Sequence, residues 1–191
     1  MAITKSNERT KYELADAMKR CMKTAPVEKI TVKEIVEACG VTRQTFYRNF
    51  QDKYDLVEWI FSEDIVSEVD RLLQHGMQQE AIKFLFTGIH KNRKFYAKML
   101  QVSGQNSLEE VLVRRLEELF RREITEKGIK DIPQNRVLNV TYVSRYYALG
   151  LATSIEAWLA GGDNEVSVDE LTEAYEFLIT HSIYDIINED V

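Results

Sequence analysis

The stretch TVKEIVEACGVTRQTFYRNFQDK, residues 31–53, decides the fold of this chain. Thr31 and Glu34 have the Thr-x-x-Glu spacing of a capping box, which predicts that a helix begins at Thr31. Gly40 predicts a tight turn after that helix, because glycine readily adopts the left-handed backbone conformation. Thr42 is then placed to cap a second, short helix. The stretch therefore predicts a helix-turn-helix unit.

The second short helix, residues 42–50, has one apolar side and one side rich in hydrogen-bond donors. Phe46 and Phe50 recur four residues apart and are expected to face the core. The positions left outward can all donate a hydrogen bond, and two are cations: Arg43, Gln44, Thr45, Tyr47, Arg48 and Asn49. Such a surface suits base edges and phosphates, so we expect this helix to be a recognition helix for DNA.

Two side chains near the start of this helix are expected to read bases. Arg43 can form two hydrogen bonds with guanine, and Gln44 can do the same with adenine. The alternative for both is a solvated helix face. Arg48 and Asn49 can reach phosphate or base. Thr31 lies at a helix N-terminus, where backbone amides can hold a phosphate.

The run GVTRQTFYRNFQDKYDL, residues 40–56, resembles the DNA-binding domain of the TetR family of bacterial transcriptional regulators. The resemblance implies that Tyr47 and Lys53 contact phosphates. Residues 43–61 and the run HKNRKFYAKML at 90–100 are similar to a Firmicutes-type branch that includes regulators of dihydroxyacetone-kinase operons. Double-stranded DNA contacts are thus expected from Thr31, Thr42, Arg43, Gln44, Thr45, Tyr47, Arg48, Asn49 and Lys53.

Composition predicts an all-α fold. The 191 residues include only two prolines and eight glycines, and residues that favour helices are abundant. We predict a helix-turn-helix domain at 1–53 and a larger helical-bundle domain for regulation and dimerisation at 54–191. The first domain is expected to have a core of Tyr12, Leu14, Ile30, Ile35, Phe46 and Phe50. Nine helices are expected, at 7–24, 31–39, 42–50, 52–74, 78–89, 92–100, 107–127, 133–160 and 167–188.

Charge is unevenly distributed along the chain, whose net charge is -6. Residues 1–55 contain eleven Lys or Arg and eight Asp or Glu, which gives +3 and leaves -9 for the remainder. A mildly basic end on an acidic body suits a protein that binds DNA through one end.

Several classes of protein and site are not expected. No apolar run approaches the ~20 residues of a membrane span, and the N-terminus lacks the apolar core of a signal peptide, so we predict a cytoplasmic protein. Cys21, Cys39, His75, His90 and His181 do not have the spacing of metal ligands. No cofactor and no enzymatic activity are expected, because no catalytic motif is present.

The last two predicted helices carry apolar stripes with small residues among them, where another helix can approach closely. One interpretation is packing within the chain, and the other is a four-helix interface of a homodimer. The resemblance implies the homodimer, whose two recognition helices would enter successive major grooves roughly 34–36 Å apart. The interface residues would be Val140, Val143, Tyr147, Gly150, Ser154, Trp158, Leu171, Tyr175, Leu178 and Ser182.

The predicted body is rich in aromatic residues, which indicates a packed core or, alternatively, an effector pocket. The candidates for an effector site are Phe120, Tyr142, Arg145 and Tyr146, and the effector can be a small molecule or a protein. We expect a homodimeric repressor that reads a palindromic operator. One alternative is an activator of a metabolic operon, such as a dihydroxyacetone-kinase operon, governed by a protein partner. A lesser alternative is a helical adaptor that binds protein.

Overall fold

The computed structural model describes residues 2–102, 107–128, 136–161 and 166–186, with side chains from residue 7 onward. Every regular element in these ranges is helical, so the all-α prediction is confirmed. The elements are α1 (Ala2–Thr24), η1 (Val27–Lys29), α2 (Val32–Cys39), α3 (Arg43–Asn49), α4 (Lys53–Phe61), η2 (Ser62–Val66), α5 (Ser67–Gln74), α6 (Gln78–Lys91), α7 (Arg93–Met99), α8 (Leu108–Lys127), α9 (Val140–Ala160), α10 (Val168–Thr180) and α11 (Ile183–Ile186).

The helix predicted at 52–74 is one continuous helix, in which α4 and α5 are joined by the π-helical turn η2. With this helix counted once, the described part of the chain has ten α-helices, of which nine are long. The additional short helix arises because the last predicted helix, at 167–188, is divided. Residues 187 and 188 lie outside the described ranges.

The division of the last helix has a local cause. His181 has an extended backbone, with φ -122° and ψ 140°, and ends α10. Ser182 then donates hydrogen bonds of 2.7 Å to the Asp185 carboxylate through both its N–H and its hydroxyl, which starts α11. Similarly, α9 begins at Val140 rather than at residue 133, because Asn139 Oδ1 accepts a hydrogen bond of 3.0 Å from the N–H of Tyr142.

The predicted core of the first three helices is correct except for one residue. The side chains of Leu14, Ile30, Ile35, Phe46 and Phe50 are buried. Tyr12 is 52% exposed, and its hydroxyl donates a hydrogen bond of 2.7 Å to Glu63 Oε2. Glu63 lies in η2, so this contact ties α1 to the continuous helix formed by α4, η2 and α5, which we call the connecting helix.

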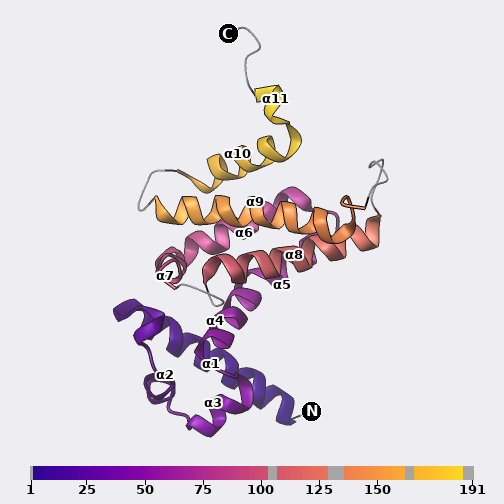
Figure 1. Ribbon diagram of the computed structural model, residues 1–191. Helices are drawn as coiled ribbons and strands as arrows, with labels where there is room; N and C mark the ends of the chain where they lie inside the picture. Colours follow the sequence, from indigo (N-terminus) through magenta and orange to yellow (C-terminus); the bar gives the residue numbers. More distant parts are fainter. Residues whose placement is uncertain (1, 103–106, 129–135, 162–165, 187–191) are drawn as a thin grey trace.

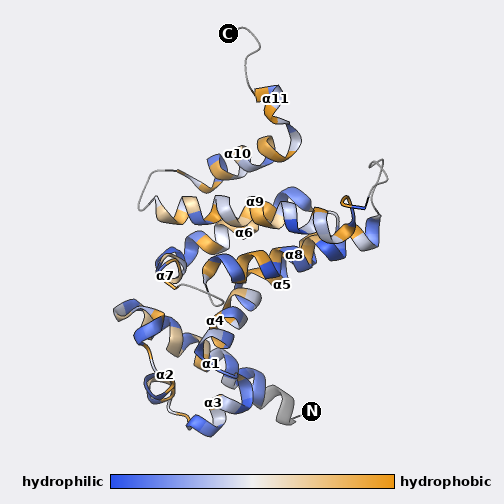
Figure 2. Ribbon diagram, viewed as in Figure 1, coloured by the Kyte–Doolittle hydropathy of each residue, from blue (hydrophilic) through white to orange (hydrophobic). Residues whose placement is uncertain are grey.

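The helices α1, α2 and α3 form one end of the molecule, and α4 leads from them into the body (Figure 1). In the body α8 and α9 pack side by side, α6 lies against α5, and α10 packs on α6. The buried apolar side chains form one continuous cluster from Leu14 to Tyr175. Figure 2 shows that apolar residues also occur along α10 and α11, where the chain has few neighbours.

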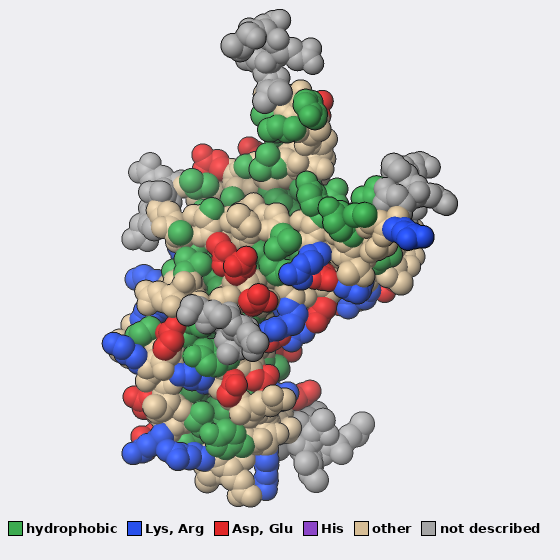
Figure 3. Space-filling view, viewed as in Figure 1, with side chains coloured by type: hydrophobic (Ala, Val, Ile, Leu, Met, Phe, Trp, Pro, Cys, Tyr) green, Lys and Arg blue, Asp and Glu red, His purple; other side chains and the backbone are tan. Residues whose placement is uncertain are grey.

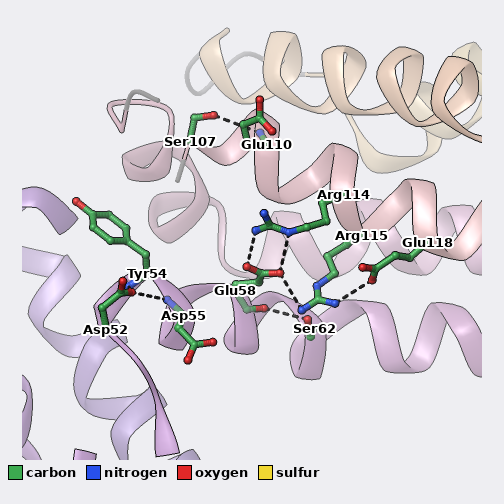
Figure 4. A network of polar contacts seen from close by, with 10 residues as sticks. All are labelled: Asp52, Tyr54, Asp55, Glu58, Ser62, Ser107, Glu110, Arg114, Arg115 and Glu118. Carbon is green, nitrogen blue, oxygen red and sulfur yellow. Dashed lines mark hydrogen bonds and ion pairs between the residues drawn. The ribbon is translucent and has the colours of Figure 1, made fainter. Parts of the chain in front are cut away.

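Two contacts fix the connecting helix to the body. Glu58 on α4 binds Arg114 and Arg115 on α8, as Figure 4 shows, with nitrogen–oxygen distances of 2.5 and 2.8 Å. At η2, Gly88 of α6 packs so closely that a Cβ there would lie 3.0 Å from Ile65 Cγ1. The position of α4, and with it the position of α3, is therefore set by contacts from α6 and α8.

Candidate nucleic-acid interface

The turn between α2 and α3 is held by hydrogen bonds at both ends. Gly40 has φ 74° and ψ 26°, the left-handed conformation, and its N–H donates to the carbonyl of Val36. Thr42 Oγ1 accepts a hydrogen bond of 3.1 Å from the N–H of Thr45. The direction of α3 relative to α2 is therefore fixed by local sequence, as the capping pattern predicts.

The helix α3 has a buried side and an exposed side. Phe46 and Phe50 are buried, and their ring centroids are 5.9 Å apart. Tyr47 is 58% exposed, and its ring meets that of Phe46 edge-on at 5.4 Å. The structure brings four of the predicted DNA-binding side chains together on the exposed side: Arg43, Gln44, Tyr47 and Arg48.

Thr45 and Asn49 are half-buried rather than outward, which corrects the sequence-based prediction for these two residues. Thr45 Oγ1 lies 3.0 Å from Thr42 Oγ1, so the two hydroxyls share a hydrogen bond. Asn49 Nδ2 donates to the Thr45 carbonyl at 2.8 Å, because the two residues lie one helical turn apart. These three side chains thus stabilise α3 itself and offer DNA fewer free donors than predicted.

Thr31 begins α2 with the predicted capping box, and Glu34 occupies both of its donors. Glu34 Oε2 accepts hydrogen bonds from the Thr31 N–H at 2.7 Å and from its hydroxyl at 2.8 Å. Both hydrogen bonds hold the pKa of the Glu34 carboxyl below its ordinary value, and the bond from the Thr31 N–H has the larger effect. A carboxylate therefore stands beside the helix start where a phosphate was expected.

Lys53 is held against the segment that precedes α2. Its Nζ donates hydrogen bonds of 2.8 Å to the carbonyls of Glu28 and Ile30. Partial burial lowers the pKa of this lysine. Two of its three N–H bonds are thus used inside the protein, and one is left for a phosphate.

Two further basic side chains position α3, and sequence reasoning missed their roles. Arg20 on α1 donates a hydrogen bond of 2.9 Å to the carbonyl of Ala38, near the end of α2. Lys11 lies over the rings of Phe50 and Trp59, with Nζ 5.7 and 5.6 Å from the centroids. No local sequence pattern predicts these contacts, because they join helices that are distant in sequence.

The predicted interface stripe divides into buried and exposed residues. Trp158 and Tyr175 are buried, and both rings meet Phe86 edge-on at 6.1 and 6.2 Å. This corrects the prediction that these two residues face a partner. Half-buried members of the stripe are Val140, Val143, Ser154 and Leu171. Exposed members are Tyr147, Gly150, Leu178 and Ser182.

More apolar side chains are exposed beside this stripe than the sequence pattern selected. Figure 3 shows hydrophobic side chains gathered over α9, α10 and α11. Within α9, α10 and α11, the large exposed apolar residues outside the predicted stripe are Tyr142, Tyr146, Leu149, Phe177, Ile179, Ile183, Tyr184 and Ile186. We call these residues, together with Tyr147 and Leu178, the exposed apolar face.

The four candidate effector residues do not surround one cavity. Tyr142, Arg145 and Tyr146 line an open groove of about 760 Å³ at the start of α9. Phe120 is half-buried and does not line that groove; the centroid of its ring lies 6.2 Å from that of Tyr147. Arg145 Nη1 forms an ion pair of 3.1 Å with Glu117 Oε2, and the same carboxylate also binds Arg121.

The two cysteines are free and half-buried, and burial raises the pKa of both thiols. Within the described ranges, no group of three or more His, Cys, Asp or Glu side chains is placed to hold a metal ion. The described helices also include none that is long and apolar enough to cross a membrane.

Family models match most of the chain. A model of bacterial regulatory proteins of the TetR family matches residues 14–60, and a model of a transcriptional regulator C-terminal region matches residues 77–181. The chain is 27% identical over 158 residues to the HTH-type dhaKLM operon transcriptional activator DhaS of Lactococcus lactis subsp. lactis (strain IL1403). That match covers 82% of this chain and 83% of DhaS.

Solved structures share the fold. The dihydroxyacetone kinase operon activator DhaS superposes with a TM-score of 0.60 at 23% identity, over 90% of this chain and 92% of DhaS. A TetR-family transcriptional regulator from Syntrophomonas wolfei str. Goettingen gives a TM-score of 0.63 at 17% identity, over 95% of this chain and 100% of that one. The matched families consist of regulators rather than enzymes. The chain therefore belongs to the TetR family of bacterial transcriptional regulators.

Proposed function

We propose that this regulator reads DNA through the exposed side of α3, with Arg43 and Gln44 on base edges and Tyr47 and Arg48 on phosphates. The observation that supports this most is the division of α3 itself. Its phenylalanines are buried while its four exposed side chains can donate hydrogen bonds, two of them as cations. A helix face that only contacts water does not require every exposed side chain to be a hydrogen-bond donor.

The other predicted contacts take supporting roles in this proposal. Thr42, Thr45 and Asn49 keep α3 in shape, and Thr31 does the same for α2. Lys53 can bind one phosphate with its remaining N–H bond while it holds the segment before α2. We place the boundary between the DNA-binding domain and the regulatory domain at residues 53 and 54, where α4 leaves the helix-turn-helix unit.

We also propose a homodimer that uses the exposed apolar face. Monomeric proteins rarely expose large contiguous apolar patches, and this face extends over three consecutive helices. A two-fold axis through it would place two α3 helices on a palindromic operator. Because bacterial DNA lies in the cytoplasm, the dimer would act there.

The direction of regulation has two candidates. A repressor that blocks transcription by occupying its operator needs only DNA binding and an effector on the C-terminal domain. The relative DhaS is named as an activator of the dhaKLM operon, which favours the second candidate, an activator of a metabolic operon controlled by a protein partner. Reporter expression from the promoter beside the gene, with and without the regulator, distinguishes the two.

The DNA-reading proposal is tested by fluorescence anisotropy with the DNA that flanks the gene. We expect binding tighter than to scrambled DNA, with an affinity that falls steeply as salt rises. The variant R43A should lose preference for the operator, whereas K127A, which changes an exposed lysine of α8, should not. An R43A variant with unchanged preference would refute the role of Arg43 in base reading. Equal, weak binding to both DNAs would favour the adaptor.

A further inference from the structure

A groove between the DNA-binding end and the body is lined mainly by cations. It lies where the end of α1 meets α7, at the left of Figure 1, and its volume is about 800 Å³. That volume is within the range of small-molecule sites. Its cationic side chains are Lys19, Lys23, Lys91, Arg93, Lys94 and Lys98, and no Asp or Glu is among the described residues that line it.

Three of these cations have partners inside the protein. Lys19 Nζ forms an ion pair of 2.6 Å with Asp64. Lys98 Nζ donates hydrogen bonds to the last turn of α1, at 2.5 and 3.0 Å. Arg93 donates a hydrogen bond of 2.6 Å to the carbonyl of Trp158 and lies over its ring. These contacts build the groove.

The other three cations are Lys23, Lys91 and Lys94, which are exposed. None of them has a carboxylate within ion-pair distance among the described residues. This contrasts with the rest of the body, whose basic side chains often pair with acids and whose net charge is strongly negative. Figure 3 shows Lys and Arg side chains along this edge of the molecule. The groove therefore has a concentrated positive charge that the chain leaves unbalanced.

The floor of the groove is partly apolar. Met22, Phe95 and Ala97 contribute carbon surface between the cations. We propose that this groove binds a small organic phosphate, with its phosphate at Lys23, Lys91 and Lys94 and its carbon skeleton on the apolar floor. Lysine ammonium groups suit phosphates because each acts as a compact point charge with several donors.

The groove is placed to connect such a ligand with DNA binding. One wall belongs to α1, whose Arg20 supports the end of α2, and the other wall belongs to the body. A phosphate bound to Lys23 on one wall and to Lys91 and Lys94 on the other would hold α1 against the end of α6 and the start of α7. The site differs in place from the open groove at the start of α9 and from the surface of α3.

The test is a binding titration that needs no DNA, so its outcome does not depend on the proposed DNA reading. Trp158 serves as the reporter, because the His90 ring stacks on it at 5.9 Å and both His90 and Arg93 line the groove. The variant W59F leaves Trp158 as the one tryptophan of the sequence. We expect its fluorescence to change saturably with inorganic pyrophosphate in a phosphate-free buffer of low ionic strength.

The matched variants are K91Q/K94Q at the groove and K83Q/K127Q on other exposed parts of the body, each made in the W59F protein. Both pairs remove two positive charges. We expect K91Q/K94Q to weaken pyrophosphate binding by roughly tenfold or more, and K83Q/K127Q to leave it nearly unchanged. All four lysines are exposed, and matching thermal unfolding midpoints would show that the variants fold.

Three results would overturn the inference. The first is the absence of a saturable change with pyrophosphate, and the second is an equal loss in the two double variants. The third is a change in DNA binding. Without pyrophosphate, we expect K91Q/K94Q to bind flanking DNA with the same salt dependence as the parent. A reduced salt slope in K91Q/K94Q would instead assign the groove to the DNA backbone.

Discussion

Replacing Glu58 by Gln tests the link between the connecting helix and the body. The Glu58 carboxylate accepts hydrogen bonds from Arg114 Nε at 3.1 Å and Nη2 at 2.5 Å, and it pairs with Arg115 at 2.8 Å (Figure 4). Its side chain is 18% exposed, against 44% for Arg114 and 30% for Arg115. The network is therefore intermediate between a solvated surface pair and a buried one.

The expected cost follows from that position. Exposed ion pairs contribute about 0.2–1 kcal/mol, whereas removing one partner of a buried pair costs about 3–5 kcal/mol. We expect E58Q to lower the free energy of unfolding by about 1–2 kcal/mol, because two arginines lose a shared, partly buried partner. The matched control is E118Q, since Glu118 is 57% exposed and, among the described residues, has Arg115 as its one ion-pair partner; it should cost less than about 0.5 kcal/mol.

Urea unfolding at low salt, followed by circular dichroism, measures both variants. A double-mutant cycle of E58A and R114A isolates the pair, and we expect a coupling energy of about 0.5–1.5 kcal/mol. The reasoning is refuted if E58Q and E118Q cost the same, or if the coupling energy is indistinguishable from zero. Either result would mean that the ion pair of Glu58 with Arg114 does not hold α4 against α8.

Further predictions concern the helix-turn-helix unit and the exposed apolar face. G40A should lower the free energy of unfolding by about 1 kcal/mol, because alanine is strained at φ 74° although its Cβ would meet no atom within 4 Å, and urea unfolding should show G40N to be milder. K53M should lose about 1–2 kcal/mol of stability as well as DNA affinity, whereas loss of affinity alone, by anisotropy, would contradict its structural role. L178E should keep the fold of the subunit within about 0.5 kcal/mol but abolish dimers in sedimentation measurements, and persistent dimers would exclude this face. Because Glu34 has a lowered pKa, its contribution to stability should be present above pH 4.5 and lost as pH falls through the lower folded value, a loss that E34Q should lack in urea unfolding at several pH values.

The helix-turn-helix unit could be predicted from sequence because its determinants are local. Thr31, Gly40 and Thr42 each act on backbone within a few residues, so their positions in the sequence specify the structure. The inward direction of Phe46 and Phe50 also follows from helical periodicity. The same holds for the continuous helix from α4 to α5, which its apolar pattern predicts without the π-turn inside it.

The contacts between distant helices could not be predicted in this way. Periodicity identifies the apolar side of a helix but not the surface that covers it. The pattern therefore predicts a partner for Trp158, although its ring packs against Phe86 of the same chain. The hydrogen bonds of the Lys53 ammonium group go to carbonyls 25 and 23 residues away, and no residue near Lys53 in the sequence indicates these partners. The groove at α7 likewise depends on α1, because Lys19 and Lys98 line the same groove only in the folded chain.

The π-helical turn Ser62–Val66 also constrains how hybrid regulators can be built from this chain. Such a turn accommodates one extra residue within a helix, and each residue of an α-helix advances the chain by about 100° around the axis. A chimera that keeps the number of residues between α3 and the body, but takes its body from a relative whose helix lacks the π-turn, would rotate α3 by about a quarter of a circle relative to the body. In the proposed dimer, the two α3 helices would then no longer face the same side of the DNA.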